Sequence, residues 1–227
     1  MAIAFVNAAA NVTAGSASSI AAPATSLTTG NLIVVGVRLN TLTIIPGGNA
    51  TLSDTAGNLY RYVASIPDSA NGAQLEAYYA SNVTGNAANV VTASFTASAF
   101  TSIVTLQIAG LATGSPLDAF AFAQNTTGAT ITSGALTTTV AAEMLVMIAQ
   151  QSSTAATWSA GTGFTLATQD ASGIQGIEYQ VVSTLQSAIT PTMVSTNTGS
   201  PAKQGLVLTF NASTGGGGST TTGFASA

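Results

Sequence analysis

Apolar residues recur at every second position along this chain, which is the period of a β-strand. The segment 32–37, LIVVGV, is apolar in both alternating sets of positions, as expected of a central strand buried on both faces. Residues 102–108 (SIVTLQI) and 205–210 (GLVLTF) have the same character. Turn sequences separate such runs: PGGN at 46–49, TGN at 84–86, TGS at 113–115 and TGSP at 198–201. Because no sustained helical period is found, the sequence predicts an all-β protein.

The two halves of the chain resemble each other. The first half reads TSLTTGNLIVVGV, SDTAGNLYRYVASI, AQLEAYYASN and FTSIVTLQIAG, and the second reads GALTTTVAAEMLVMIA, SAGTGFTLATQDAS, IQGIEYQVVS and AKQGLVLTFNAS. Each half gives a Thr-rich lead into a buried strand, a Gly-containing turn into an aromatic strand, a strand carrying Glu beside Tyr, and an apolar closing strand. We therefore predict an internal four-strand pseudo-repeat covering about residues 26–110 and 137–211.

Two sets of four strands and an N-terminal strand at 3–6 make about nine strands. The expected fold is a β-sandwich, with an eight-stranded jelly roll as the close variant. Four short strands bury too little apolar surface alone, so both repeats should share one core in a single domain, residues 1–212. Residues 213–227 are rich in Gly, Ser and Thr and predict a flexible tail. Its GGGGS stretch is compatible with an engineered linker and with a native arm.

Charge is scarce. Only 4% of the residues are charged, against about 25% in ordinary globular proteins. The three basic residues, Arg38, Arg61 and Lys203, are too few for a nucleic-acid groove or a polybasic lipid-binding segment. LIVVGV is far shorter than the roughly 20 residues of a membrane helix, and the N-terminus has no cationic region before an apolar stretch. We therefore expect no nucleic-acid or membrane partner. We also expect either synthesis in the cytosol without a secretory signal or a mature form from which the signal was removed.

Cysteine and histidine are both absent. Their absence removes disulfides, the usual zinc, haem, copper and iron–sulfur ligands, and Ser-His or Cys-His catalysis. The GGGG stretch at 215–218 lacks the Lys-Ser/Thr ending of a phosphate loop. We therefore expect no cofactor.

The polar turn SDTAGN at 53–58 contains one of the seven acidic residues, Asp54. Asp and Asn flank a Gly there, as in tight turns whose side chains bond nearby backbone N–H groups. The functional alternative is a Ca²⁺ loop with Asp54 and Asn58 as oxygen ligands. Calcium usually takes several carboxylates, and Asp68 is the only other acid close in sequence, so the turn is the favoured interpretation.

Glu76 and Glu178 lie at matching places in the two halves. Two carboxylates about 5 to 9 Å apart are the minimum for glycoside hydrolysis. The alternative is two structural glutamates, paired with Arg61 or Arg38. A sugar-binding platform usually has several exposed aromatic residues, and this chain has one Trp, Trp158, and five Tyr. We therefore predict that the chain is not an enzyme.

A surface of Thr, Ser, Asn, Gln, Ala and Gly costs little to desolvate and has little rotamer entropy to lose. Such surfaces pack against identical neighbours without charge repulsion. This property favours a homo-oligomer or a repeated lattice.

The chain also resembles a β-sandwich module of tailed-bacteriophage virion proteins that is found in some bacterial surface proteins. The resemblance covers most of residues 3–211 and rests on turn and strand elements: Gly30-Asn31-Leu32, Ser53-Asp54 with Ala56-Gly57-Asn58, Tyr79 before Ala80-Ser81-Asn82, Leu117-Asp118, and Gly161-Thr162-Gly163-Phe164. It implies virion structure or surface display, and it carries over no catalytic residue. The implied location is the virion, assembled in the host cytoplasm.

The sequence therefore leads us to expect a capsid decoration or cement protein that contacts the major capsid protein or tail proteins. Two segments are expected to reach neighbouring subunits: the N-terminal residues Ala2, Ile3, Phe5 and Val6, and the tail with Phe224. The alternatives are a receptor- or glycan-binding tail-fibre appendage and a subunit of an extracellular filament with an exchanged strand. The appendage would use exposed aromatics around Trp158 or the loops at 66–73 and 170–176.

Overall fold

The computed structural model describes residues 1–13, 15–40, 50–68, 72–98, 100–125, 128–152, 156–199 and 202–213. Every regular element in these ranges is a β-strand, which confirms the all-β prediction. Strands of the first half are β1 (Ala4–Val12), β2 (Ala17–Ala21), β3 (Thr25–Leu27), β4 (Leu32–Asn40), β5 (Thr51–Asp54), β6 (Arg61–Asp68), β7 (Ala73–Ala80), β8 (Asn86–Asn89), β9 (Val91–Ser98) and β10 (Thr101–Ala109). Strands of the second half are β11 (Leu117–Asn125), β12 (Thr130–Thr132), β13 (Glu143–Gln151), β14 (Trp158–Ser159), β15 (Thr165–Gln169), β16 (Gln175–Val182), β17 (Thr192–Ser195) and β18 (Lys203–Asn211).

The described residues form eighteen strands, about twice the number predicted. Two of the additional strands are long, β9 with eight residues and β11 with nine. The others have two to five residues; β3 and β12, for example, have three residues each and β14 has two. Strands of this length contain too few residues to show a period of two, and their pairing is decided by neighbours that are distant in sequence. The jelly-roll variant stays a prediction.

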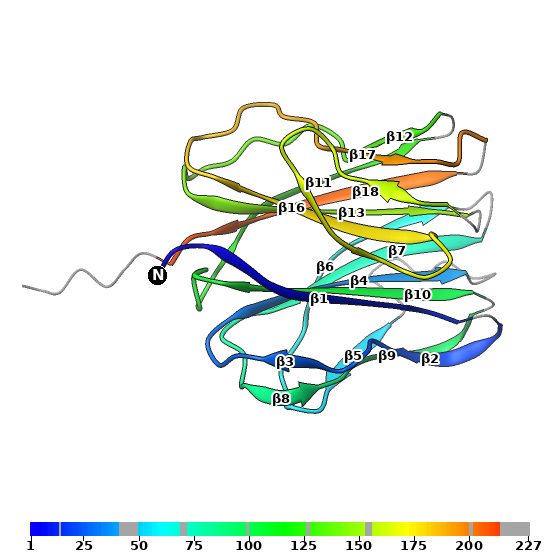
Figure 1. Cartoon of the computed structure of the whole chain (residues 1–227), viewed down its shortest axis with the longest axis horizontal. Coiled ribbons are helices and arrows are strands. Elements are labelled where there is room, and N and C mark those ends of the chain that lie inside the picture. The colour runs from blue at the N-terminus through cyan, green and yellow to red at the C-terminus, as the bar shows by residue number, and fades with distance from the viewer. Residues whose placement is uncertain are drawn as a thin grey trace, which may run out of the picture.

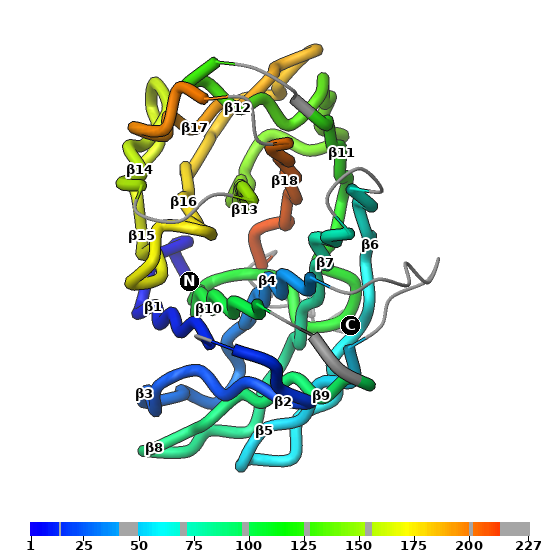
Figure 2. The backbone as a smooth tube through the Cα atoms, turned by 90° about the vertical axis from the view of Figure 1, so that its right-hand side faces the viewer, coloured from blue at the N-terminus to red at the C-terminus, as the bar shows by residue number. Residues whose placement is uncertain are grey.

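The strands form two large and three small antiparallel sheets (Figure 1). The large sheets have the orders β1-β10-β4-β7-β6 and β11-β18-β13-β16-β15. The small sheets are β2-β9-β5, β3-β8 and β12-β17-β14. Figure 2 shows the sheets as four layers: the small sheets of the first half, its large sheet, the large sheet of the second half, and its small sheet. This stacking is a β-sandwich with an additional layer on each side.

Both halves build their sheets in the same order. Exchanging β1, β10, β4, β7 and β6 for β11, β18, β13, β16 and β15 converts one large sheet into the other. The same exchange converts β2-β9-β5 into β12-β17-β14, and the bridge between Leu136 and Ile189 takes the place of the β3-β8 pair. The eight segments of the pseudo-repeat read from the sequence contain β4, β6, β7 and β10 in the first half and β13, β15, β16 and β18 in the second.

The apolar core has three parts because the layers meet at three places. The central part lies between the two large sheets and contains residues of both halves, including Leu106 and Leu206. The other two parts lie between each large sheet and the small sheets of its own half. Strand β4 shows why its sequence is apolar on both faces: Leu32 and Val34 belong to the central part, whereas Ile33 belongs to the core of the first half.

Gly36 lets the two large sheets approach each other. A Cβ atom at this position would lie 2.8 Å from Ile148 Cγ2 and 3.0 Å from Val104 Cγ2. Ile148 belongs to β13 of the opposite sheet, so a side chain at position 36 would push the layers apart.

All four edge strands of the large sheets are irregular. Each has a register shift in its pairing: β1 between Phe5 and Asn7, β6 between Tyr62 and Ala64, β11 between Leu117 and Phe120, and β15 between Leu166 and Thr168. Bulges at edges disturb the row of backbone donors and acceptors that would template pairing with another chain. The edges of the large sheets therefore have a local feature that opposes open-ended strand addition.

Nowhere in the described part of the chain is there a helix of the length and hydrophobicity that a membrane crossing needs.

Candidate functional site

The distribution of charge is the most unusual property of the surface. The chain has three basic and seven acidic side chains. Seven of these ten are buried: Arg38, Asp68, Glu76, Glu143, Asp170, Glu178 and Lys203. Asp54 and Asp118 are half-buried, and Arg61 is the one charged side chain that is exposed. The 4% charged residues predict a surface with little charge, and burial removes most of even those charges from the surface.

Asp54 organises the turn that follows β5. Its Oδ1 accepts the backbone N–H groups of Ala56 at 3.1 Å and Asn58 at 2.9 Å. Its Oδ2 accepts the Asn58 side-chain amide at 2.8 Å, the Tyr60 hydroxyl at 2.9 Å and the Asn89 amide at 3.2 Å. Burial raises the pKa of the Asp54 carboxyl group, but the hydrogen bonds from Asn58, Tyr60 and Asn89 lower it more, so that the pKa lies below its ordinary value.

The same contacts favour the turn over the calcium loop. Both Asp54 oxygens already accept hydrogen bonds, and the Asn58 side-chain oxygen accepts the backbone N–H of Thr84 at 2.7 Å. Across the described ranges, no three Asp, Glu, His or Cys side chains come together in a group that could hold a metal ion.

Asn58 connects this turn to the loop after β7. In addition to accepting the Thr84 N–H, it donates its amide to the Thr84 carbonyl at 3.4 Å. The loop is held from its other side by Val83, which exchanges backbone hydrogen bonds with Gly30 and Asn31. Two loops that are distant in sequence are thereby fixed next to each other.

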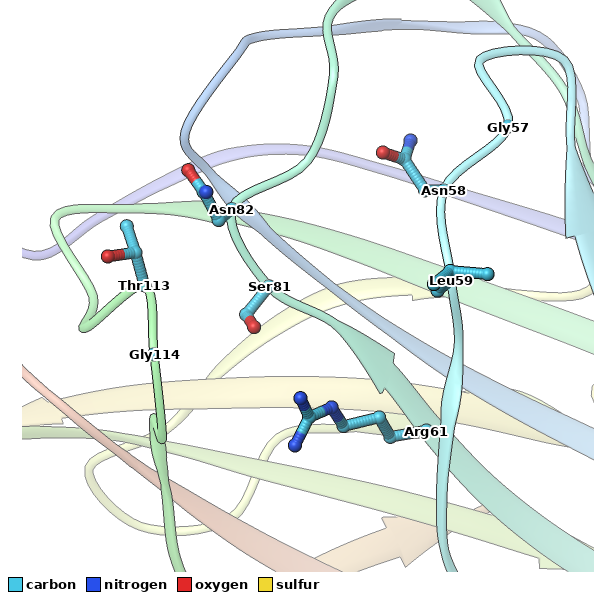
Figure 3. Close-up of a pocket in the computed structure, with 8 residues that line it drawn as sticks. All are labelled: Gly57, Asn58, Leu59, Arg61, Ser81, Asn82, Thr113 and Gly114. Carbon is cyan, nitrogen blue, oxygen red and sulfur yellow. The ribbon is translucent and has the colours of Figure 1, made fainter.

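An open pocket of about 480 Å³ lies at these loops (Figure 3). It is lined by residues of the turn after β5, the start of β6, the loop after β7 and the link between the two halves: Gly57, Asn58, Leu59, Arg61, Ser81, Asn82, Thr113 and Gly114. Figure 3 shows the Arg61 side chain extending from β6 toward Gly114, with the Ser81 hydroxyl on the same side. The sequence does not predict this pocket, because its lining comes from three separate segments, 57–61, 81–82 and 113–114, whose proximity depends on the fold.

The two matching glutamates point in opposite directions. In β7, Leu75 and Ala77 face the central core, so Glu76 faces the core of the first half. In β16, Ile177 faces the central core, so Glu178 faces the core of the second half. Both large sheets therefore lie between the two carboxylates, which cannot act as a pair on one substrate.

Each glutamate instead accepts a backbone N–H group near a short outer strand. Glu76 Oε2 accepts the N–H of Ala50 at 3.1 Å, and Glu178 Oε2 accepts the N–H of Gly161 at 2.9 Å. Burial raises the pKa of Glu178 to about 8, although the Gly161 hydrogen bond opposes this change. Arg38 faces the central core, on the side of the sheet away from Glu76, so the predicted pairing of Arg38 with Glu76 is not supported.

Trp158 is a core residue, so its predicted role as an exposed aromatic is wrong. Its exposed fraction is 2%, and it packs with Ile131, Met147 and Met193 between the sheets of the second half. The indole N–H donates to the Gly173 carbonyl at 3.1 Å. The loop at 170–176 is likewise closed on itself, since Asp170 accepts the backbone N–H groups of Ser172, Ile174 and Gln175.

The N-terminal residues proposed as an arm belong largely to the body of the fold. Phe5 and Val6 lie in β1, which pairs with β10. Ile3 packs against the central core, and Ala2 lies so close to Gly110 that a Cβ there would be 2.1 Å from the Ala2 carbonyl oxygen. Phe5 and Val6 are therefore part of the sheet and not of a free arm. Their side chains are 37% and 38% exposed, and their contact with a neighbouring subunit stays a prediction. Phe224 lies outside the described residues.

The Phe5 ring joins the two halves. It stacks on Tyr179 of β16 with a centroid distance of 5.0 Å and an interplanar angle of 4°. At the opposite seam, where β6 lies next to β11, Phe120 and Phe122 are 44% and 49% exposed. They pair with Leu208 and Leu206, so they lie on the face of their sheet that looks toward the first half. The alternating sequence FAF at 120–122 predicts one exposed face of a strand, and its position at a seam follows from the fold.

A buried polar cluster lies between the two large sheets at the end opposite the N-terminus. Ser102 of the first half donates to Asp170 of the second at 2.8 Å, and Gln124 of the second donates to Asp68 of the first at 3.4 Å. Burial lowers the pKa of Arg38 to about 10, and the nearby Asp170 and Asp68 carboxylates oppose this change. Arg38 therefore stays protonated at neutral pH, and these contacts fix how the halves sit against each other.

Comparison of the chain with protein-family models, with curated proteins and with solved structures found no match.

Proposed function

We propose that the chain is a non-enzymatic structural protein that works by lying against other protein subunits. The observation that carries this proposal is the charge distribution: seven of ten charged side chains are buried, and Arg61 is the one that is exposed. Contact with another protein desolvates whatever is on the surface, and charged groups are the most expensive groups to desolvate. This surface has few charged groups, so contact with another protein incurs little of that cost.

The same distribution is unfavourable for a protein that remains separate. A dispersed domain normally keeps copies apart with surface charges of both signs and a net charge. Here the remaining exposed apolar side chains include large aromatic ones, Phe120 and Phe122, beside each other on the edge strand β11. Aromatic side chains at the centre of a contact contribute much of its binding energy. We take this aromatic pair as the contact region of the proposed assembly.

Within this class, the resemblance to virion modules supports a capsid decoration or cement protein. A four-layer body with a shared core gives a rigid block, and a block of this kind strengthens a shell by adding contact area at each lattice point. A homo-oligomer or a regular coat would present the same uncharged surface to each neighbour.

Sedimentation velocity tests the proposed association. We expect the full chain to self-associate as its concentration rises, and the association to be insensitive to salt because few charges take part. The variant Phe122→Lys should associate less, and Val194→Lys, at an exposed position of the outer sheet, is the matched control for the added charge.

Co-sedimentation tests the virion assignment. Empty shells assembled from the major capsid protein encoded alongside this chain should retain it and become more resistant to heat. A chain that stays monomeric at every concentration and also fails to bind such shells would contradict the proposal.

The tail-fibre alternative loses two of the three places expected for its site; the third, the loop at 66–73, includes residues 69–71, which lie outside the described ranges. Trp158 lies in the core, and the loop at 170–176 is closed by Asp170. The filament alternative needs an exchanged strand, whereas β1 and β18 both pair within the chain.

A further inference from the structure

We propose that the pocket around Arg61 binds an acidic saccharide, with the guanidinium group holding the sugar carboxylate. This binding site goes beyond the proposed structural role and does not depend on it. Three features of the pocket lead to the assignment: an unpaired cation, neutral polar groups without partners, and walls that are already fixed.

Arg61 provides the cation of the proposed site. Arg61 is exposed, and within the described part of the chain its side chain forms no ion pair or hydrogen bond. It projects into a concave region rather than into bulk solvent (Figure 3). The other two basic side chains, Arg38 and Lys203, are buried, so this pocket is where the protein offers an exposed basic side chain to a ligand. A guanidinium presents parallel N–H groups that match the two oxygens of a carboxylate.

Neutral polar side chains surround the Arg61 guanidinium group in the pocket. Ser81 and Thr113 bring hydroxyls and Asn82 brings an amide, and these side chains have no hydrogen-bond partner among the described residues. Hydroxyls and amides can both donate and accept, which suits the hydroxyl groups of a sugar. Gly57 and Gly114 at the rim have no side chain to cover the backbone.

The walls are held in place without a ligand. Asp54 fixes Asn58, and Asn58 bonds both backbone groups of Thr84, so the turn after β5 and the loop after β7 form one unit. Asn82 lies within this unit at a φ of 52°, in the left-handed region that non-glycine residues seldom adopt. Asn adopts this region more readily than other non-glycine residues, so the residue type fits the conformation that the loop requires. A pre-formed site loses less entropy on binding.

The presence of a single cation in the pocket also favours a carboxylate over a phosphate as the ligand. Phosphate sites usually combine several basic groups or the N–H groups of a helix N-terminus, and the described residues contain no helix. One guanidinium matches the single charge of a carboxylate. The surrounding hydroxyls and amide can bond the several hydroxyl groups of a sugar ring, whereas the last peptide unit beside a carboxylate offers one N–H and one C=O.

The test is an NMR titration of the full chain with D-glucuronic acid. We expect millimolar binding, with backbone amide shifts confined to the lining residues. D-Glucose, acetate, inorganic phosphate and N-acetylalanine should each bind at least about tenfold more weakly, since none of them combines a carboxylate with a sugar ring. The variant Arg61→Gln should abolish binding, and Ser81→Ala should weaken it.

Controls separate charge and folding from binding. Thr130→Asp, at an exposed position of β12, lowers the net charge by the same amount as Arg61→Gln and should bind like the wild type. Arg61→Lys keeps the charge and should bind more weakly than the wild type because the bidentate geometry is lost. Equal binding by Arg61→Gln and the wild type, or an absence of shifts at the pocket at high glucuronate concentration, would overturn the proposal. Equal or tighter binding of acetate, phosphate or N-acetylalanine would overturn the assignment to a saccharide. Self-association is measured separately, so failure here leaves the proposed structural role intact.

Discussion

The Asp54 carboxylate accepts hydrogen bonds from both the backbone N–H and the side-chain amide of Asn58, at 2.9 and 2.8 Å. A local turn is thereby coupled to distant parts of the chain, because Asn58 also bonds Thr84 and Asp54 also accepts from Asn89. One acidic side chain connects β5, the turn before β6 and β8 directly, and the loop after β7 through Asn58. Asp54 therefore has a structural role, and its replacement should also displace the loops that line the Arg61 pocket.

Replacing Asp54 should destabilise the fold. Asp54→Ala leaves the N–H of Asn58 and the side-chain amide of Asn89 without their acceptor, whereas the Ala56 N–H keeps Asn89 Oδ1 as a second acceptor at 3.2 Å. We therefore expect a loss of about 1–3 kcal/mol in the free energy of unfolding. Urea denaturation measures this loss. Asp54→Asn keeps one acceptor oxygen and should lose less than Asp54→Ala; equal stability of the wild type and Asp54→Ala would contradict the assigned role.

Stability should fall in acid because of the same carboxyl group. Its folded-state pKa lies below its unfolded value, so its contribution is present above the unfolded pKa and is lost as the pH falls through the folded pKa. We expect the unfolding free energy of the wild type to decline below about pH 4 more steeply than that of Asp54→Asn. Parallel pH profiles for the two proteins would refute this expectation.

Glu178 should change the stability with pH in the opposite direction to Asp54. Burial raises its folded-state pKa from 4.5 to about 8, so the folded state binds the proton more tightly than the unfolded state. Its stabilising contribution is therefore present below the unfolded pKa and is lost as the pH rises through about 8.

The variant Glu178→Gln tests this prediction. The glutamine keeps an oxygen for the Gly161 N–H and carries no charge, so thermal unfolding at pH 9 should occur at a higher temperature than in the wild type. The difference should disappear near pH 4. A variant that is less stable than the wild type at pH 9 would show that the charged form is the one the fold accommodates.

Gly36→Ala should destabilise the contact between the two large sheets. The added Cβ would meet Ile148 Cγ2 at 2.8 Å and Val104 Cγ2 at 3.0 Å, and overpacking of this kind costs about 1–3 kcal/mol. Gly15→Ala is the control, because nothing lies within 4 Å of a Cβ at Gly15. Chemical denaturation of both variants gives the comparison, and equal stability of the two would show that the sheets can separate freely.

Trp158→Ala should cost about 3–5 kcal/mol, because it removes a buried indole and its hydrogen bond to Gly173. Phe122→Ala deletes an aromatic ring that is 49% exposed and should change the unfolding free energy much less. Denaturant unfolding of both variants separates a core residue from a surface residue. A stable Trp158→Ala protein would indicate that the indole has a role other than packing.

The sequence was informative wherever a property is local. The run LIVVGV predicted a strand buried on both faces, and β4 at the centre of its sheet, with core on each side, is that strand. The residues SDTAGN predicted a turn, because the Asp and Asn side chains bond the backbone within a few residues of themselves. The sequence was misleading for Trp158, since an isolated Trp in a polar context does not reveal which sheet covers it.

Sequence alone thus determined the β period, the turn at 53–58 and the shortage of charge, because each of these depends on residues that are adjacent or nearly so. The tertiary structure decided which face of each strand is covered, and therefore that Glu76 and Glu178 point apart, that Phe120 and Phe122 lie at a seam, and that Arg61 stands alone in a pocket. The physical reason is that strand alternation fixes only that successive side chains point to opposite faces. Whether a face meets another sheet or solvent depends on how the layers stack, and stacking brings together residues from both halves of the chain.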